Sequence, residues 1–247
     1  MKVQPIILAG GKGKRMGNAE LPKVLSPLKD RPIISYLLDT FRDLPFLQPV
    51  LVVGFRQEMV RQAVGPEYRY IVQEEQLGTG HAVSVCRSEL EGTADCYLIL
   101  YGDMPLWSGQ TMQKLVGQHQ ESGSVLSMVT VNADHETFKS FGRIIRDDQG
   151  RIRAIREQRD CSPDELEISE VNPGLYCVDD RWLWDALERI TCENAQAEYY
   201  LTDLLSLAIA DGEKVESIRV EDWREALGIN TPEQLMEVER ILAGIHS

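Results

Sequence analysis

The chain has 247 residues, of which 43% are hydrophobic and 26% are charged, a composition typical of a soluble globular protein. Its net charge of −13 argues against nonspecific nucleic-acid binding, and no apolar run approaches the ~18 residues that a membrane-spanning helix requires. The five cysteines are odd in number and form no C-x-x-C pair, which argues against zinc ribbons and disulfide scaffolds and fits a cytoplasmic protein. We therefore expect neither a nucleic-acid nor a membrane partner.

The first half of the chain alternates predicted strands with predicted helices. The strands are apolar throughout rather than at every second position, and the segments between them have helical spacing of apolar residues. This alternation indicates an α/β fold with a mostly parallel sheet covered on both faces. Strands are predicted at 3–9, 49–54, 69–72, 96–101 and 124–131, and helices at 33–44, 56–64, 79–91 and 109–121.

The second half predicts a mixed α+β lobe. Residues 143–146 and 152–156 flank Asp147-Asp148-Gln149-Gly150, which indicates an antiparallel hairpin. A further strand is predicted at 171–178, with helices near 180–189, 201–211 and 232–243. No internal repeat or linker is apparent, so we expect one domain over residues 1–247.

The loop after the first predicted strand is suited to polyphosphate. It runs Leu8-Ala9-Gly10-Gly11-Lys12-Gly13-Lys14-Arg15-Met16 and continues to Pro22-Lys23. Its glycines leave backbone amides free to approach phosphate oxygens, and its cations can bind them. Residues 1–23 carry five cations and one acid, a net charge of +4 on an acidic protein. The spacing fits neither a Walker A loop nor a dinucleotide fingerprint, so on this motif alone a solvated basic turn remains an alternative.

A second candidate follows the strand at 96–101. Ligands of open α/β sheets bind at the carboxyl ends of the strands, where both Tyr101-Gly102-Asp103 and the glycine loop fall. Asp103 could be an ordinary helix cap, but its position near a cationic loop favours a metal role. Mg²⁺ takes one or two protein oxygens and fills its other positions with phosphate and water.

Further motifs occur in order along the rest of the chain. They are Gln73 with Gln76-Leu77-Gly78-Thr79-Gly80-His81-Ala82, Tyr101-Gly102-Asp103-Met104-Pro105-Leu106, Phe141-Gly142-Arg143-Ile144, Glu157, Glu170-Val171-Asn172-Pro173-Gly174, Asn194-Ala195-Gln196-Ala197-Glu198-Tyr199-Tyr200-Leu201-Thr202-Asp203, and Gly228-Ile229-Asn230-Thr231. With the glycine loop, they resemble the sugar-phosphate nucleotidylyltransferases. The closest likeness is to the uridylyltransferase domain of the bacterial N-acetylglucosamine-1-phosphate uridylyltransferases, over about residues 3 to 236.

The resemblance implies a role for each matching residue. The nucleotide would be bound by Leu8, Ala9, Gly10, Gly11, Gln73, Gly78 and Thr79, and the catalytic cations would be Arg15 and Lys23. The metal ligands would be Asp103 and Asn230, holding Mg²⁺. The sugar would be bound by Tyr101, Gly102, Gly142, Glu157 and Asn172. From the residues alone, Asn230 could instead cap the last helix and Glu157 could be a surface charge, although Thr231 before Pro232 already suits capping.

The implied reaction joins UTP and N-acetylglucosamine 1-phosphate to give UDP-N-acetylglucosamine and pyrophosphate in the cytoplasm. Two alternatives stay open. One is the same chemistry with another sugar 1-phosphate, such as glucose 1-phosphate, or another nucleotide, such as dTTP or CTP. The other is a non-catalytic protein that binds nucleotide sugars. The sequence does not predict an oligomeric state.

The resemblance also implies a Rossmann-like, mostly parallel sheet of the nucleotide-diphospho-sugar transferase fold with a mixed sugar-binding lobe. Residues 1–103 would form the nucleotide-binding half, 104–227 the sugar-binding half, and 228–247 a metal ligand and the last helix. No hexapeptide repeat is present, so we expect no left-handed β-helix acetyltransferase domain within these residues. Whether the chain is a stand-alone enzyme or an excised domain stays open. Lys14 departs from the family, which usually has threonine there.

Overall fold

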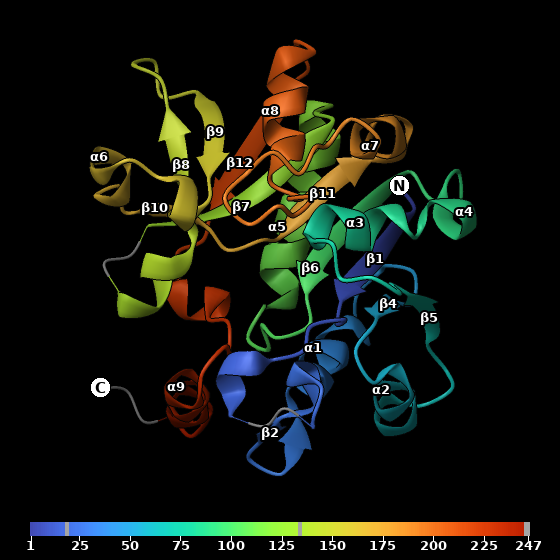
Figure 1. Ribbon diagram of the computed structural model, residues 1–247. Coiled ribbons are helices and arrows are strands. Elements are labelled where there is room, and N and C mark those ends of the chain that lie inside the picture. The colour runs from blue at the N-terminus through green and yellow to red at the C-terminus, as the bar shows by residue number, and fades with distance from the viewer. Residues whose placement is uncertain (18–19, 133–134, 245–247) are drawn as a thin grey trace.

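A single sheet of ten strands runs through the protein. The computed structural model describes residues 1–17, 20–132 and 135–244, and the sheet has the order β5-β4-β1-β6-β11-β7-β10-β8-β9, with β12 paired to β7 (Figure 1). Its strands are β1 (Val3–Leu8), β4 (Val50–Val53), β5 (Arg69–Val72), β6 (Cys96–Tyr101), β7 (Leu126–Asn132), β8 (Gly142–Arg146), β9 (Ile152–Arg156), β10 (Glu170–Asn172), β11 (Tyr176–Asp179) and β12 (Val215–Arg219). A separate small hairpin pairs β2 (Pro27–Leu28) with β3 (Arg31–Pro32).

The first four strands of this order are parallel, as predicted. β1 pairs with β4 on one side and with β6 on the other, and β4 pairs with β5. Leu8 lies opposite both Val52 and Tyr101 in the register. The carboxyl ends of β1, β4 and β6 therefore meet at one edge of the sheet, and the loops that leave them begin side by side.

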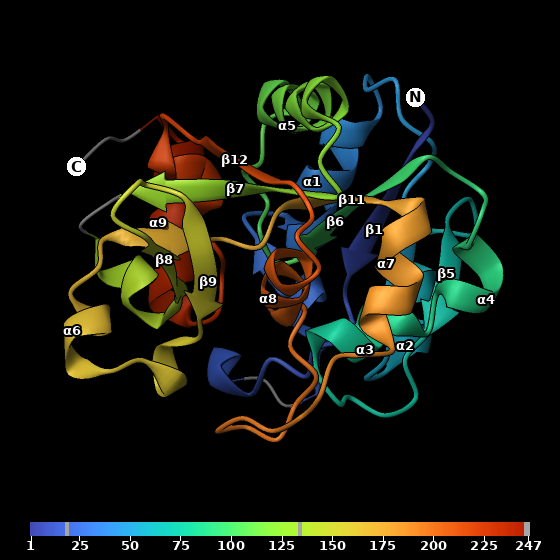
Figure 2. The same ribbon diagram turned by 90° about the horizontal axis from the view of Figure 1, so that it is seen from above.

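Helices cover both faces of the sheet. Figure 2 shows α1 and α5 over one face and α3, α7 and α8 over the other, each packed on its own apolar core. Neighbouring residues of one strand, such as Ile6 and Ile7, enter opposite cores because side chains alternate along a strand. The helices are α1 (Ile33–Phe41), α2 (Gln57–Val64), α3 (Thr79–Ser84), α4 (Arg87–Leu90), α5 (Gly109–Ser122), α6 (Pro163–Leu166), α7 (Asp180–Leu187), α8 (Asp203–Ala210) and α9 (Pro232–Leu242). Short 3-10 turns are η1 (Lys14–Met16), η2 (Lys23–Leu25), η3 (Glu136–Ser140), η4 (Gln158–Asp160) and η5 (Trp223–Ala226).

The second half forms the mixed lobe that the sequence predicts. β8 and β9 make the expected antiparallel hairpin, β10 joins it to β7, and β11 runs antiparallel between β6 and β7. The predicted strand at 171–178 is wrong as a single element, because it breaks at Pro173-Gly174 into β10 and β11. Gly174 has a φ of 91°, and a Cβ there would lie 2.0 Å from the Tyr101 ring.

The structure differs from the sequence-based expectation in two other places. The helix predicted at 79–91 divides into α3 and α4. Strand β12 was not predicted. Its residues are half-buried apart from Ile218 and Arg219, so they give no continuous apolar run, and its pairing with β7 depends on residues far away in the sequence.

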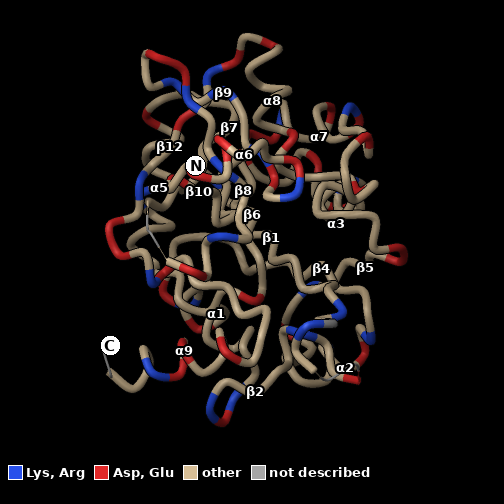
Figure 3. Tube along the Cα trace, turned by 60° about the vertical axis from the view of Figure 1, so that its left-hand side comes forward, with Lys and Arg blue, Asp and Glu red and all other residues tan. Residues whose placement is uncertain are grey.

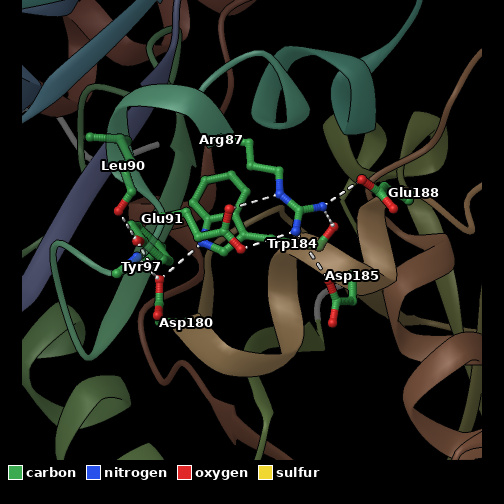
Figure 4. A network of polar contacts seen from close by, with 9 residues as sticks. Arg87, Leu90, Glu91, Tyr97, Asp180, Trp184, Asp185 and Glu188 are labelled. Carbon is green, nitrogen blue, oxygen red and sulfur yellow. Dashed lines mark hydrogen bonds and ion pairs between the residues drawn. The ribbon is translucent and has the colours of Figure 1, made fainter.

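A polar network fixes α4 against α7. Arg87 bonds to Asp185, Glu188 and the Trp184 carbonyl across the helix pair (Figure 4). Next to it, the Asp180 carboxylate contacts the Tyr97 hydroxyl at 2.7 Å and accepts from Trp184 Nε1 at 3.0 Å. The network holds α7 on the sheet face that α3 also covers.

Acidic and basic residues are interspersed over both halves of the described chain (Figure 3). Among the described residues, no helix is both long enough and apolar enough to cross a membrane.

Candidate functional site

A cavity of about 230 Å³ lies at the carboxyl ends of β1 and β6. It is lined by Lys23 and by every residue that the resemblance assigns to the nucleotide, which are Leu8, Ala9, Gly10, Gly11, Gln73, Gly78 and Thr79. We call it the nucleotide cavity after the ligand that the resemblance implies. Backbone bonds between neighbouring strand ends draw these loops together. The Ala9 amide donates to Val52 O at 2.8 Å, and the Gln73 amide donates to Val53 O at 2.8 Å.

Gln73 has a fixed side chain within this cavity. It is 4% exposed, and its Nε2 donates to Gly78 O at 3.0 Å. Its Oε1 would lie 3.3 Å from a Cβ on Gly10, so even alanine would press on it there. The carboxamide therefore presents an acceptor oxygen next to the glycine loop.

The segment at 194–202 closes the nucleotide cavity from the second half of the chain. Tyr199 N donates to Leu77 O and Gly80 N donates to Tyr199 O, both at 2.8 Å, while Leu201 N donates to Thr79 Oγ1 at 2.9 Å. A Cβ on Gly78 would lie 2.5 Å from Tyr199 O. Only glycine allows these two backbones to approach so closely.

A second cavity, of about 490 Å³, adjoins the first and is lined by most of the residues that the resemblance assigns to the sugar. We call it the sugar cavity after this expected ligand. It is lined by Tyr101, Gly142, Glu157 and Asn172, together with Arg15, Asp103 and Asn230. Tyr101 and Asp103 line both cavities. The two cavities therefore meet at the carboxyl end of β6.

Two polar side chains of this second cavity, the buried Asn172 and the half-buried Glu157, are oriented by hydrogen bonds. Asn172 Nδ2 donates to the Tyr176 hydroxyl at 2.5 Å, and its Oδ1 accepts from the Gly174 amide at 3.1 Å. Glu157 Oε1 accepts from Thr202 Oγ1 at 3.0 Å. Burial raises the pKa of Glu157 above its ordinary value, and the bond from Thr202 only partly offsets this.

Cations and oxygen donors converge where the cavities meet. Lys23 Nζ contacts Asp103 Oδ2 and lies 2.6 Å from Asn230 Oδ1, and Arg15 donates to the same Asn230 oxygen at 3.0 Å. Asn230 does not cap α9, because the Thr231 side chain does so by accepting from the Gln234 amide. Four residues from three distant parts of the chain thus converge at one point.

A family profile for the MobA-like NTP transferase domain matches residues 5–203, which is most of the chain. The chain belongs to this family. The predicted resemblance to nucleotidylyltransferases is thereby confirmed. Bifunctional protein GlmU of Heliobacterium modesticaldum is 42% identical to it over 237 residues, and that of Burkholderia orbicola is 45% identical over 237 residues. Each alignment covers 96% of this chain and 51% of the relative, so the chain spans about half the length of the curated relatives it matches.

A solved structure of the same fold is described as a putative glucose-1-phosphate thymidylyltransferase from Bacillus anthracis in complex with a sucrose. It matches with a TM-score of 0.76 and 18% identity, covering 99% of this chain and 97% of that one. This likeness confirms the predicted fold class.

Membership of the family does not by itself assign a role to each residue, so we compare the assigned residues with the lining of the two cavities. Of the assigned residues, Gly102 alone lines neither cavity. A Cβ there would lie 3.1 Å from Val24 and 3.3 Å from Ile7, so this glycine serves close packing. The side chain of Lys14 lies outside the described part of the chain.

The cavities are also lined by residues to which the resemblance assigns no individual role. Glu198 and Gln76 line the nucleotide cavity. Ser140, Gln158, Arg159 and Gln196 line the sugar cavity. Gln158 and Arg159 directly follow Glu157, and Gln196 lies in the motif at 194–203, so adjacency to assigned residues was the available signal.

Proposed function

We propose that this protein is a uridylyltransferase that converts UTP and N-acetylglucosamine 1-phosphate to UDP-N-acetylglucosamine and pyrophosphate. The observation that carries the proposal is the junction of the two cavities at Tyr101 and Asp103, with Lys23 and Arg15 beside it. A nucleotide in one cavity and a sugar phosphate in the other would bring their phosphates together there. The 38–45% identity with GlmU proteins supports the same assignment.

The nucleotide cavity supports uracil or thymine over cytosine. Because Gln73 Nε2 is engaged by Gly78 O, its Oε1 is the group available to a base. N3 of uracil and thymine carries a hydrogen and can donate to this oxygen, whereas N3 of cytosine is an acceptor and would repel it. UTP is therefore favoured over CTP.

The sugar cavity supports a ligand with several polar groups. Glu157 can accept hydrogen bonds from hydroxyls, and Asn172 can pair with an amide such as the N-acetyl group. Both side chains are held by Thr202 and Tyr176 before any ligand arrives, which lowers the entropic cost of binding.

The reaction needs positioning and charge neutralisation more than proton transfer. A sugar phosphate is largely dianionic at pH 7, since the second pKa of a phosphate monoester is about 6, so its oxygen attacks the α-phosphorus of UTP without a general base. Pyrophosphate leaves on the opposite side. Lys23 and Arg15 neutralise negative charge on the phosphates and hold them in line.

Asp103 and Asn230 fit a Mg²⁺ ion as the implied cofactor. Both direct side-chain oxygens at one point, and the Lys23 ammonium contacts both of them as a cation already accommodated there. Oxygen donors of this kind are the ligands that Mg²⁺ prefers. When bound, the ion supplies neutralisation of phosphate charge.

A grid of pyrophosphate-release assays tests this function. UTP, dTTP, CTP and ATP are each combined with N-acetylglucosamine 1-phosphate, glucose 1-phosphate and galactose 1-phosphate in the presence of Mg²⁺. We expect the highest kcat/KM for UTP with N-acetylglucosamine 1-phosphate. A higher kcat/KM for any other pair would reassign the substrate, and no pyrophosphate from any pair would support a binding protein instead.

A further inference from the structure

A cluster of two cysteines and one histidine lies in the core, on the side of the sheet covered by α5. Cys96 begins β6, Cys177 lies in the neighbouring strand β11, and His119 comes from the last turns of α5. Their exposed fractions are 1%, 0% and 4%. The sulfur atoms of the two cysteines and a ring nitrogen of His119 all lie within 4.8 Å of one another. In the described part of the chain, no other three residues of the types His, Cys, Asp and Glu come together in this way.

We propose that Cys96, His119 and Cys177 bind a thiophilic divalent cation of the Zn²⁺ type. Zn–S bonds of about 2.3 Å at a tetrahedral angle place two sulfurs about 3.8 Å apart. The sulfurs of Cys96 and Cys177 are already 3.5 Å apart, so a shift of a few tenths of an ångström would complete this pair. Two thiolates and a neutral imidazole also balance a charge of +2, which makes the buried centre neutral overall.

The surroundings of His119 supply two further features of a metal site. Its Nδ1 lies 2.9 Å from Ser127 Oγ and 3.3 Å from Ser124 Oγ, and contacts of this kind hold the ring in one orientation. His119 also borders a cavity of about 480 Å³ that opens near the start of α7 and is lined by Asp179. This cavity gives an ion a path to the cluster and a place for a fourth ligand.

The cluster is separate from the proposed reaction site. Cys96 and Tyr101 are opposite ends of β6, on the order of 17 Å apart at a rise of about 3.3 Å per residue. Sulfur ligands favour Zn²⁺-type ions, whereas the oxygen donors near Lys23 favour Mg²⁺, so the two sites would bind different ions. The bound ion therefore links β6, β11 and α5 as a structural centre, independent of nucleotide chemistry.

Cobalt substitution tests the proposal on the full chain. The reduced, metal-stripped protein is titrated with Co²⁺ in excess Mg²⁺, and the thiolate-to-cobalt charge-transfer band is recorded. We expect the band to saturate at one equivalent, to disappear when Zn²⁺ is added, and to be accompanied by a higher Tm with Zn²⁺. Absence of a saturable band in the unaltered protein overturns the proposal by itself.

Variants then identify the ligands. Cys177→Ser and His119→Gln should each weaken Co²⁺ binding by at least ~10-fold. The matched control is the double variant Cys161→Ser/Cys192→Ser, which removes the two least buried thiols and should leave the band unchanged. Circular dichroism checks that each variant is folded, and His119→Gln, at the cavity margin, serves if Cys177→Ser does not fold. A band that persists in the folded ligand variants, or that is lost in the control, would assign the metal to other thiols.

Discussion

Lys23 is the residue on which the charge balance of the proposed reaction site depends. Its ammonium contacts both oxygen donors, Asp103 and Asn230, and Asn230 also receives a bond from Arg15. The side chains of Lys23 and Asp103 are 14% and 16% exposed, so water screens this pair less than it screens a surface ion pair. In the proposed reaction, a divalent ion at Asp103 and Asn230 would release Lys23 to contact the phosphate oxygens.

We predict that Asp103→Asn lowers kcat by at least ~100-fold without unfolding the protein, because the loss of a metal carboxylate removes several kcal/mol of transition-state stabilisation. The measurement is Mg²⁺-dependent pyrophosphate release, with circular dichroism as the folding check. Asp95→Asn is the control, since Asp95 precedes the same strand at its far end. Near-normal turnover in folded Asp103→Asn would remove Asp103 from the reaction site.

Glu157 should give sugar binding a pH dependence. Its pKa is raised, mainly by burial, so its carboxylate becomes protonated at a higher pH than an exposed glutamate. If the ionised carboxylate accepts hydrogen bonds from sugar hydroxyls, the KM for the sugar phosphate will rise as the pH falls through this raised pKa. We predict that Glu157→Gln removes this dependence, whereas Glu165→Gln in α6 leaves it unchanged.

The unfolding free energy gives a second measurement for Glu157. A raised pKa in the folded state means that folding disfavours the charged form, so this group begins to oppose folding as the pH rises above its unfolded pKa and does so fully above the folded value. Glu157→Gln should therefore be at least as stable as the unaltered chain at neutral pH. A clear loss of stability there would show that the bond from Thr202 outweighs the cost of burial.

At the scale of elements, the contact between α3 and the segment at 194–202 shapes the nucleotide cavity. We predict that Gly78→Ala weakens UTP binding by at least ~10-fold in calorimetric titration, because its Cβ would lie 2.5 Å from Tyr199 O and the backbone must separate. Gly150→Ala is a matched control. Gly150 also has a positive φ, 76°, but an added Cβ meets nothing within 4 Å.

The control separates two effects of the same substitution. Both alanines are strained by positive φ, at a cost of about 1–3 kcal/mol in stability, and the cost is larger for Gly78→Ala because its φ of 121° and ψ of 176° lie in a region that is essentially restricted to glycine. Only Gly78→Ala adds a clash next to the nucleotide. Equal UTP affinity in the two variants would mean that the contact with Tyr199 is not needed for binding.

The network between α4 and α7 belongs to the same scale. Burial by itself raises the pKa of Asp180, but bonds from Tyr97, the Gly92 amide and Trp184 outweigh it and lower the pKa below its ordinary value. We predict that Asp180→Asn lowers the free energy of unfolding by about 1–3 kcal/mol at pH 7 in urea titrations. Asp185→Asn, a surface partner of Arg87, should cost only about 0.2–1 kcal/mol.

The sign of the pH dependence follows from the lowered pKa. A carboxylate with a depressed folded pKa stabilises the protein above its unfolded pKa of about 3.9 and loses that contribution as the pH falls through the folded value. The difference between Asp180→Asn and the unaltered chain should therefore shrink in that acidic range. A difference that stays constant from pH 7 down to pH 2 would point to packing rather than charge.

For the whole molecule, one sheet connects the two proposed substrate halves. β11 bonds to β6 of the first half and to β7 of the second, and the segment at 194–202 returns to α3. We predict a single calorimetric unfolding transition whose Tm rises with UTP, because neither half can open without breaking this sheet. Two separate transitions, with only one moved by UTP, would divide the chain into independent domains.

The sequence by itself determined the parallel α/β half, the β8–β9 hairpin and the family. These features depend on local patterns: apolar runs, helical spacing, a turn of Asp, Gln and Gly, and short motifs in a fixed order. Through the family resemblance, the sequence also named residues from Leu8 to Thr79 that line the first cavity, whereas the position of the glycine loop after a predicted strand indicated only a phosphate-binding loop.

Only the tertiary structure decided the features that depend on distant partners. It divided residues 171–178 at Gly174, where the Tyr101 ring occupies the space of a side chain, and it formed β12 by pairing with β7. Likewise, it joined Cys96 and Cys177, 81 positions apart, beside His119. Sequence spacing carries no signal for such contacts, because their geometry is set by the register of the sheet and by the helix packed on it.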